Sequence, residues 1–402
     1  MKVIITATDN PYQVRVGGKH VHQLLLEKGL SRLGVDVSTI YPNIEPEPAA
    51  KRYIKYVLSI LRSFDFSSIY KDRVWQILTQ LKSLYTSHQD EIANADVIHF
   101  HDVLALYSFI ESNPSNSTPR ILTLHGYFAR EFLDYNRIPR VARNKVYNFA
   151  LEIERGAIPN SDFIIAVDSR IKSYVLTSFD YPKNKICTLP NAIDTETFKP
   201  VSMDEQKLLK KQLRFAPNDF LILVPRRLVP KNGVIYAVKA MKYIKNENIK
   251  LIIAGDGIER RNIEKEIRKE GLGKKVLLIG SVPHSEIHKY FKAVDVVLIP
   301  SITSHGVQEA TSLAALEGMS CGKPVIVTNV GGLKEIVTNR RTGIIVPEKD
   351  PEAIATAIET ILENPDVATI IGSNAREYVL KHHSYISYAS RVLDIYKKVI
   401  SR

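Results

Sequence analysis

Two glutamates flank a small apolar run in the C-terminal half of the chain, in the stretch EATSLAALEGMSCGKP at residues 309–324. A buried helix does not need Glu309 and Glu317, and a surface helix would carry more charge. Eight helical steps would leave the two carboxylates about 80° apart, so they would not lie on one helical face. They could instead bracket the two ends of one ligand above a helix N-terminus, where free N–H groups and the helix dipole favour phosphate.

The residues between the glutamates predict a short helix that is entered from a loop. Thr311 or Ser312 can cap this helix through its side-chain oxygen, and residues 313–319 are good helix formers. Gly322 suits the position after the last turn, and Pro324 prevents continuation. A β-branched run, PVIVT, and a glycine pair follow. We therefore predict a loop, a short helix, a tight turn and a buried strand.

Two basic residues lie in a turn after the strand-like run FLILV, in the stretch PRRLVPKNG at residues 225–233. Arg227 offers a planar fork of donors and Lys231 a compact point charge, and the pair suits a diphosphate. A solvated basic turn is the alternative. In an open α/β sheet, ligands bind at the carboxyl ends of strands, which is where this turn begins.

The N-terminal half offers glycines and histidines close to predicted strand ends. Gly17 and Gly18 follow the first strand-like run, and they either let a backbone approach a phosphate or form a plain turn. His99 and His101 would point to the same face of a regular strand, and His125 ends the next strand before a glycine. Three histidines invite a zinc interpretation, but no carboxylate or cysteine completes a recognisable ligand spacing, so we expect no metal. Of the three, we expect His125 to contact the ligand.

The pattern of strands and helices predicts an α/β fold. Continuous apolar β-rich runs alternate with helical periods, which favours parallel sheets buried on both faces in a doubly wound arrangement. There are more such runs than one sheet usually holds, and polar, proline-bearing sequence interrupts them at residues 191–218. We predict two Rossmann-like domains, residues 1–195 and 196–375, with a C-terminal helix within 376–402 that returns to the first domain.

The composition of the chain indicates which classes of partner it can bind. The 402 residues are 45% hydrophobic and 24% charged, as in an ordinary globular protein, and the net charge of +12 suits anionic partners such as nucleotide phosphates or anionic lipid. No zinc-finger spacing, RNP-like strand or arginine-rich tract points to nucleic acid. Two cysteines fit a reducing compartment, and no run approaches the ~20 apolar residues of a spanning helix. We expect a cytoplasmic protein, either soluble or peripheral at the inner face of a membrane.

Residues 51–88 form a basic segment, with seven basic and two acidic side chains. Apolar residues recur at helical spacing in two stripes, 54–61 and 74–81. Two interpretations stay open. The segment either forms helices packed on the sheet with solvated basic faces, or it presents a basic amphipathic surface to an anionic membrane or a bulky acceptor.

Together these stretches resemble retaining glycosyltransferases of the GT-B fold, the family four type (group 1). The resemblance covers nearly the whole chain, and the stretches that carry it are Gly17-Gly18, TLHG with His125, LPNAIDTETFKP, RRLVPKNG, AGDG and EATSLAALEGMSCGKPVIVTNVGGLKEIV. It implies two Rossmann-like domains that face a central cleft. The donor would be a nucleoside diphosphate sugar, and the acceptor hydroxyl would belong to a sugar or a lipid-linked molecule.

The resemblance also implies roles for the residues around the predicted short helix. Glu317 would accept hydrogen bonds from the ribose hydroxyls, and Glu309 would lie by hydroxyls of the donor sugar. Backbone N–H groups near Thr311, Ser312 and Leu313 would hold the diphosphate. Many relatives carry glycines directly after the first glutamate, whereas this chain has Ala310-Thr311-Ser312, which leaves less room above the sugar.

The remaining roles concern the reaction itself. Arg227 and Lys231 would neutralise the charge that grows on the leaving diphosphate, in place of a metal ion, so neither metal nor cofactor is expected. His125 would touch the donor sugar or its phosphate, and Gly17-Gly18 would adjoin the donor. The leaving phosphate would help to deprotonate the acceptor, with retention at the anomeric carbon. A sugar-nucleotide epimerase on the same fold and a non-catalytic sugar-nucleotide or glycan-binding protein are the alternatives.

Overall fold

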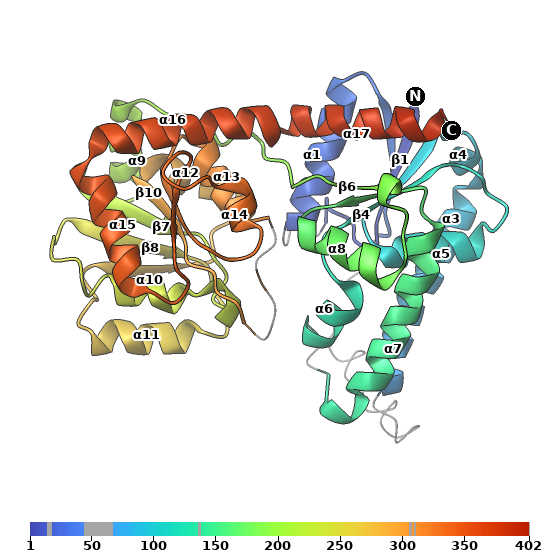
Figure 1. Cartoon of the computed structure of the whole chain (residues 1–402), viewed down its shortest axis with the longest axis horizontal. Coiled ribbons are helices and arrows are strands. Elements are labelled where there is room, and N and C mark those ends of the chain that lie inside the picture. The colour runs from blue at the N-terminus through green and yellow to red at the C-terminus, as the bar shows by residue number, and fades with distance from the viewer. Residues whose placement is uncertain (14–17, 44–66, 136–137, 305–307, 309–310, 402) are drawn as a thin grey trace. The chain divides into compact units, whose positions relative to one another are not determined.

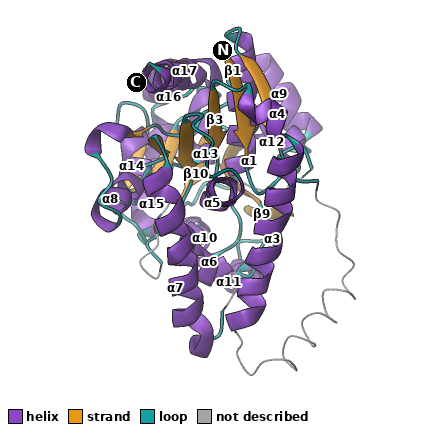
Figure 2. Ribbon diagram, turned by 90° about the vertical axis from the view of Figure 1, so that its right-hand side faces the viewer, coloured by secondary structure: helices purple, strands orange, loops and turns teal. Residues whose placement is uncertain are grey.

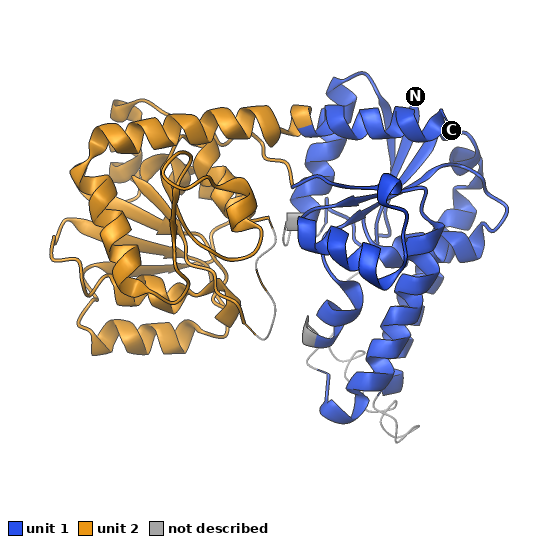
Figure 3. Cartoon of the chain, viewed as in Figure 1, with its two compact units in different colours: residues 1–190, 388–402 blue, residues 191–387 orange. Residues whose placement is uncertain are grey.

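The computed structural model describes residues 1–13, 18–43, 67–135, 138–304, 308 and 311–401. These residues form two compact units, Met1–Pro190 with Tyr388–Arg402 (unit 1) and Asn191–Ser387 (unit 2), shown in Figure 3. Sequence analysis had placed the division after residue 195 and assigned 376–402 to one returning helix. In the structure this segment contains parts of two helices, α16 (Pro365–His382) and α17 (Tyr385–Ile400), because an extended bridge between Ile193 and Ser384 separates them.

Unit 1 contains a sheet of six parallel strands in the order β2-β1-β3-β4-β5-β6 (Figure 1). The strands are β1 (Lys2–Thr6), β2 (Asp36–Ile40), β3 (Val97–Phe100), β4 (Arg120–Leu124), β5 (Phe163–Ala166) and β6 (Ile186–Thr188). The helices in the described part of unit 1 are α1 (Gly18–Arg32), α3 (Ser67–Ser87), α4 (Gln89–Ala93), α5 (Val103–Ser112), α6 (Phe128–Tyr135), α7 (Arg140–Ala157), α8 (Ser169–Ser178) and most of α17.

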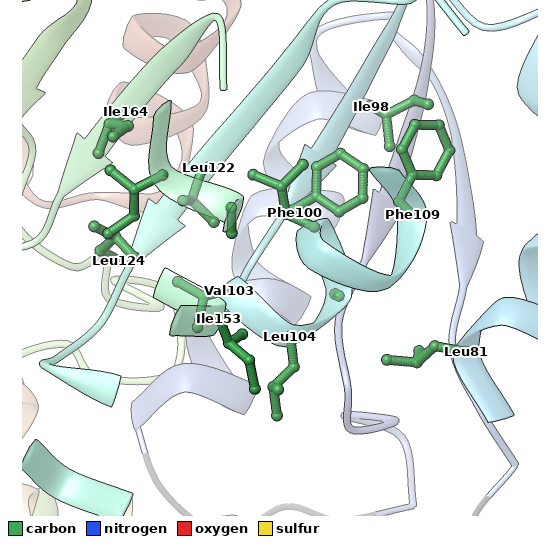
Figure 4. Close-up of a cluster of buried hydrophobic side chains, with 14 of the residues drawn as sticks. Leu81, Ile98, Phe100, Val103, Leu104, Phe109, Leu122, Leu124, Ile153 and Ile164 are labelled. Atoms are coloured by element: carbon green, nitrogen blue, oxygen red, sulfur yellow. The ribbon is translucent and has the colours of Figure 1, made fainter. Parts of the chain in front are cut away.

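The core of unit 1 explains why its strands read as continuous apolar runs. Side chains of β3, β4 and β5 pack against α5 and α7 in one buried cluster, of which Figure 4 labels Leu81, Ile98, Phe100, Val103, Leu104, Phe109, Leu122, Leu124, Ile153 and Ile164. Two helices begin directly after strands with an aspartate cap. Asp102 accepts a hydrogen bond from the Ala105 N–H at 2.9 Å, and Asp168 accepts one from the Ile171 N–H at 2.7 Å.

Unit 2 repeats this architecture with a second sheet of six parallel strands, in the order β12-β11-β10-β7-β8-β9. They are β7 (Phe220–Val224), β8 (Ile249–Ala254), β9 (Val276–Gly280), β10 (Val296–Ile299), β11 (Val325–Thr328) and β12 (Ile344–Val346). The helices are α9 (Met203–Gln212), α10 (Val234–Ala240), α11 (Arg260–Lys269), α12 (His284–Ala293), α13 (Leu313–Ser320), α14 (Leu333–Ile336), α15 (Pro351–Glu363) and α16.

Both faces of the second sheet are covered. Ile222 and Val224 of β7 belong to one buried cluster, whereas Leu221 and Leu223 belong to another. Alternate residues of one strand point to opposite faces, so two clusters require helices on both sides. Two doubly wound parallel sheets confirm the predicted α/β class.

The described part of the basic segment is the helix α3, which lies beside α7 (Figure 2). Val74, Leu78 and Leu81 of the predicted second stripe are buried, so this stripe belongs to the core. Trp75 packs on Phe149 of α7 with ring centroids 6.0 Å apart. These contacts support the packed-helix interpretation for residues 67–87, and the first stripe lies outside the described residues. None of the helices described has the length and apolar character that crossing a bilayer requires.

Candidate active site

The order of the strands shows where each unit can bind a ligand. In unit 2 the chain runs outward from β7 to β9 and then returns to the other side of β7 with β10. In unit 1 the corresponding reversal lies between β1 and β3. Helices that follow such neighbouring strands diverge to opposite faces and leave a crevice at the carboxyl ends. We therefore examine the loops after β7 and β10, and those after β1 and β3.

The turn after β7 is fixed by backbone packing against the AGDG stretch. The Leu228 N–H donates to the Asp256 carbonyl at 2.9 Å. A Cβ atom on Gly255 would lie 2.0 Å from the Arg226 carbonyl oxygen, so only glycine permits this approach. The AGDG stretch, a weak nucleotide-binding motif by sequence, thus sets the conformation of the basic turn.

A second glycine ties the same turn to the loop after β10. Gly233 has φ of 60°, and a Cβ atom there would lie 2.0 Å from the Pro300 carbonyl oxygen. Next to it, the Ile302 N–H donates to the Lys231 carbonyl at 2.8 Å. The basic turn and the loop after β10 therefore form one packed structure at the strand reversal of unit 2.

The two arginines of this turn face different surroundings. Arg227 is exposed and Lys231 half-buried, and neither side chain forms a hydrogen bond or ion pair with the described part of the chain. Arg226 instead turns inward and donates to Asn232 Oδ1 at 2.6 Å and to Ser301 Oγ at 3.1 Å. Its other terminal nitrogen lies 3.4 Å from Ser312 Oγ. Sequence analysis missed Arg226, because only the conformation of the turn decides which neighbouring arginine points inward.

The helix α13 forms as predicted, with Ser312 and not Thr311 as its cap. Ser312 Oγ accepts from the Ala315 N–H at 3.4 Å, and both Thr311 and Ser312 are buried. Leu313 begins the helix, so its free N–H groups lie beside the guanidinium of Arg226. This arrangement provides backbone donors and positive charge for an anion.

Glu317 lies one turn further along α13 and is only 8% exposed. Its Oε1 is 3.6 Å from Nε2 of His284, at the start of α12. A buried carboxylate needs polar partners, and ligand hydroxyls could supply them. Sequence analysis did not single out His284, whose place beside Glu317 depends on the packing of α12. Glu309 lies outside the described residues.

In unit 1 the strand reversal gathers histidines from three elements. The ligand nitrogens of His22 (α1), His101 (after β3) and His125 (after β4) all lie within 4.8 Å of one another. His101 Nδ1 is 3.3 Å from His125 Nε2. Among the described residues these three are the histidines that could together hold a metal ion. Gly18 begins α1, and Gly17 lies outside the described residues.

His99 stacks on His101, with centroids 4.5 Å apart, as their spacing predicts, but it turns its nitrogens to other partners. Its Nδ1 lies 2.6 Å from the Tyr396 hydroxyl and its Nε2 lies 2.7 Å from Thr123 Oγ1. His22 takes its place in the group of three, which sequence analysis missed because α1 is remote from His101 in sequence. A second tyrosine of α17, Tyr388, packs edge-on against His22 at 4.6 Å.

Burial keeps this group of histidines uncharged. Desolvation lowers the pKa of His22 and His99 to about 3, and it lowers the pKa of His101 and His125 well below the usual range. The nearby Lys19 acts in the same direction on the pKa of His101 and His125. Lys19 itself is held by Asp9 and Asp102, each at 3.0 Å.

Two family models match successive parts of the chain. The model described as Glycosyltransferase Family 4 matches residues 16–197, and the model described as Glycosyl transferases group 1 matches residues 205–378. The chain belongs to the group 1 glycosyltransferases. The family and the enzyme class that the sequence suggested are thereby confirmed.

Individual relatives of this glycosyltransferase agree. An uncharacterised glycosyltransferase of Methanocaldococcus jannaschii is 32% identical over 236 residues, which are 58% of this chain and 59% of the relative. A UDP-Gal:alpha-D-GlcNAc-diphosphoundecaprenol alpha-1,3-galactosyltransferase of Escherichia coli is 23% identical over 389 residues, 94% of this chain and 95% of that protein. Sucrose-phosphate synthase from Thermosynechococcus elongatus has the same fold, with a TM-score of 0.76 at 20% identity over 100% of both chains.

We expect the glycosyltransferase to lose stability as the pH falls below neutrality. His22 and His99 have a pKa of about 3 in the folded protein, against an ordinary value of 6.5. Between these values the unfolded chain binds protons that the folded chain does not, so the free energy of unfolding falls as the pH falls from 6.5 towards 3. Each histidine contributes up to about 1.4 kcal/mol per pH unit. Denaturant titrations across this range measure the slope.

The variant His22→Phe provides the comparison for this slope. It removes one buried histidine but keeps an aromatic ring. The slope of the unfolding free energy against pH should therefore decrease by the contribution of about one proton. Any constant packing effect of the substitution is measured at pH 8 and subtracted. A slope identical to that of the wild type would show that the pKa of His22 is the same in the folded and unfolded states.

Proposed function

We propose that this glycosyltransferase transfers a hexose from a nucleoside diphosphate sugar to an acceptor hydroxyl, with retention of anomeric configuration and without a metal ion. The observation that carries the proposal is the cationic site of unit 2. Arg227 and Lys231 make no pair with the described residues, and they lie in the turn that packs against the loop leading to α13. Unpaired positive charge at a strand reversal suits a ligand with more than one phosphate.

The donor would extend along α13. Its diphosphate would accept hydrogen bonds from the N–H groups near Thr311, Ser312 and Leu313. Glu317, nine-tenths buried, would accept hydrogen bonds from the ribose hydroxyls. Glu309 and His125 keep the roles that the family resemblance implies, at hydroxyls or phosphate of the donor sugar.

Cleavage of the sugar–phosphate bond adds negative charge to the leaving diphosphate. Arg227 and Lys231 would stabilise that charge, and a fixed cation strengthens catalysis when it acts on charge that develops in the transition state. The leaving phosphate would then accept the proton of the acceptor hydroxyl on the same face of the sugar. This route needs no protein nucleophile.

The relatives suggest which substrates to test first. The E. coli relative is named for a UDP-linked hexose donor and for an acceptor carried on a diphosphate lipid. We infer a donor of the same class and an acceptor that is lipid-linked or otherwise anionic. The net charge of +12 is compatible with both.

The variants Arg227→Ala and Lys231→Ala test the proposed function. Each should lower kcat about 10²–10³-fold, because a preorganised charge is lost from the transition state. Binding of the nucleoside diphosphate should weaken less. Release of the nucleoside diphosphate from UDP-hexoses, with and without acceptor, provides the measurement.

Arg261→Ala and Lys265→Ala are matched controls, since both residues are exposed on α11 of the same unit. They should leave kcat unchanged. Wild-type rates for Arg227→Ala and Lys231→Ala would remove the basis of the proposal. Conversion of the donor to its epimer without release of nucleoside diphosphate would indicate an epimerase, and tight donor binding without any turnover would indicate a binding protein.

Metal independence predicts that excess EDTA leaves the transfer rate unchanged. The cationic turn would do the work that a divalent ion does in enzymes with an Asp-x-Asp site. The assay compares EDTA-treated enzyme with the same enzyme resupplied with Mg²⁺ or Mn²⁺. Loss of activity that either ion restores would refute the metal-free mechanism.

Membrane contact by residues 51–88 predicts binding to anionic vesicles. Each basic residue near an anionic surface contributes about 1 kcal/mol, and less at high salt. The triple variant Lys51→Glu, Arg52→Glu, Lys55→Glu should therefore pellet less with phosphatidylserine-containing liposomes. The triple variant Arg261→Glu, Lys265→Glu, Arg268→Glu on α11 carries the same change in charge and should bind as the wild type does. Equal pelleting of both variants would contradict membrane contact and favour the other interpretation, in which the segment packs on the sheet with its basic residues in solvent.

A further inference from the structure

His125 has one hydrogen-bond partner among the described residues, His101. We infer that His101 is a positioning residue that fixes the tautomer of His125. In this tautomer His125 carries its proton on Nδ1 and can donate a hydrogen bond to the nucleoside diphosphate sugar. The inference deepens the proposed function and rests on it for the contact between His125 and the donor. The tautomer itself follows from the geometry of unit 1 alone.

The contact between the two rings requires one N–H and one lone pair. It joins Nδ1 of His101 to Nε2 of His125 at 3.3 Å. A neutral imidazole carries a single proton. If His101 Nδ1 carries the proton in this contact, His125 must carry its own proton on Nδ1. If His125 Nε2 carries it, the proton of His101 lies on Nε2. Two arrangements are therefore possible, and they differ in whether Nδ1 of His125 carries a proton or a lone pair.

The surroundings of His101 favour one of the two arrangements. His101 is 1% exposed, and its Nε2 is buried without a hydrogen-bond partner in the described part of the chain. A proton on Nε2 would be a buried donor without an acceptor, whereas a lone pair there is the less costly defect. The proton of His101 therefore lies on Nδ1 and is donated to His125 Nε2. His125 must then carry its own proton on Nδ1.

The array behind these rings holds His101 in place. His99 stacks on His101 with an interplanar angle of 25° and is itself fixed between Tyr396 and Thr123. His22 packs edge-on against His125, with centroids 5.0 Å apart. Tyr396 belongs to α17, so the C-terminal helix of unit 1 takes part in orienting His125.

The assignment has a chemical consequence. His125 is half-buried, and its Nδ1 bonds to no other described residue. With a proton on Nδ1, His125 can donate to a hydroxyl or phosphate oxygen of the donor but cannot accept a proton there. It would thus orient the sugar or stabilise the phosphate, and the acceptor would lose its proton elsewhere.

Long-range ¹H–¹⁵N NMR of the full chain, labelled with ¹⁵N in its histidines, reads the tautomer directly. The signals of His125 are assigned from their loss in His125→Asn. We expect a protonated Nδ1 and an unprotonated Nε2 for His125 in the wild type, and a change of tautomer in His101→Leu. A protonated Nε2 in the wild type would overturn the inference.

A three-histidine metal site is the competing explanation, because the nitrogens of His22, His101 and His125 converge. Spectra recorded with EDTA and with one equivalent of Zn²⁺ should be the same. Simultaneous shifts of all three histidines on adding Zn²⁺, reversed by EDTA, would replace the tautomer inference by a metal site.

Kinetics separate positioning from packing. The side-chain amide of His101→Asn can place an N–H near the Nδ1 position, whereas His101→Leu cannot. We expect His101→Leu to lower kcat at least about tenfold, with unchanged affinity for UDP, and His101→Asn to recover most of this loss. Equal losses in both variants would indicate a packing role and contradict the inference. If His125→Ala leaves kcat unchanged, the proposed role of His125 fails, while the NMR result still decides the tautomer.

Discussion

The close approach of two backbones at the end of β7 controls the rest of the unit 2 site. Gly255 lies against the Arg226 carbonyl, and Gly233 lies against the Pro300 carbonyl. Side chains at either glycine would push the basic turn away from the strand reversal. Because the turn is held on both sides, Arg226 points to the cap of α13 while Arg227 stays exposed. One backbone constraint thus gives two adjacent arginines different surroundings, one hydrogen-bonded within the unit and the other exposed.

The strand reversal of unit 1 differs from that of unit 2 in the residues that it gathers. It gathers uncharged histidines and tyrosines, of which His22, His99, His101, Tyr388 and Tyr396 are buried and His125 is half-buried. Burying this many polar rings is costly unless they bond to one another, and hydrogen bonds between His99, Tyr396 and Thr123 offset part of that cost. Among the described residues, both ring nitrogens of His22 and Nε2 of His101 are buried without a hydrogen-bond partner. The histidine group of unit 1 is therefore neutral, whereas the turn after β7 in unit 2 carries Arg226, Arg227 and Lys231.

The proposed function assigns a separate task to each of the two strand reversals. The proposed donor combines a highly charged diphosphate with a neutral sugar. Cations suit the first, and oriented hydrogen-bond donors suit the second, because a charged group placed at the sugar would be costly to desolvate. Under the proposed function, the charged reversal of unit 2 would suit the diphosphate, and the neutral reversal of unit 1 would suit the sugar.

Local periodicity and contiguous motifs were enough to predict the α/β class, the parallel sheets, the short helix that begins at Leu313, and the family. The sequence also pointed to Arg227, Lys231 and Glu317, since residue type and position after a strand suffice for that. Three contacts could not be predicted in this way: Arg226 turns inward, His284 lies beside Glu317, and His22 replaces His99 in the histidine group. Those contacts join residues far apart in the chain, and their geometry depends on how strands and helices pack, which no local pattern encodes.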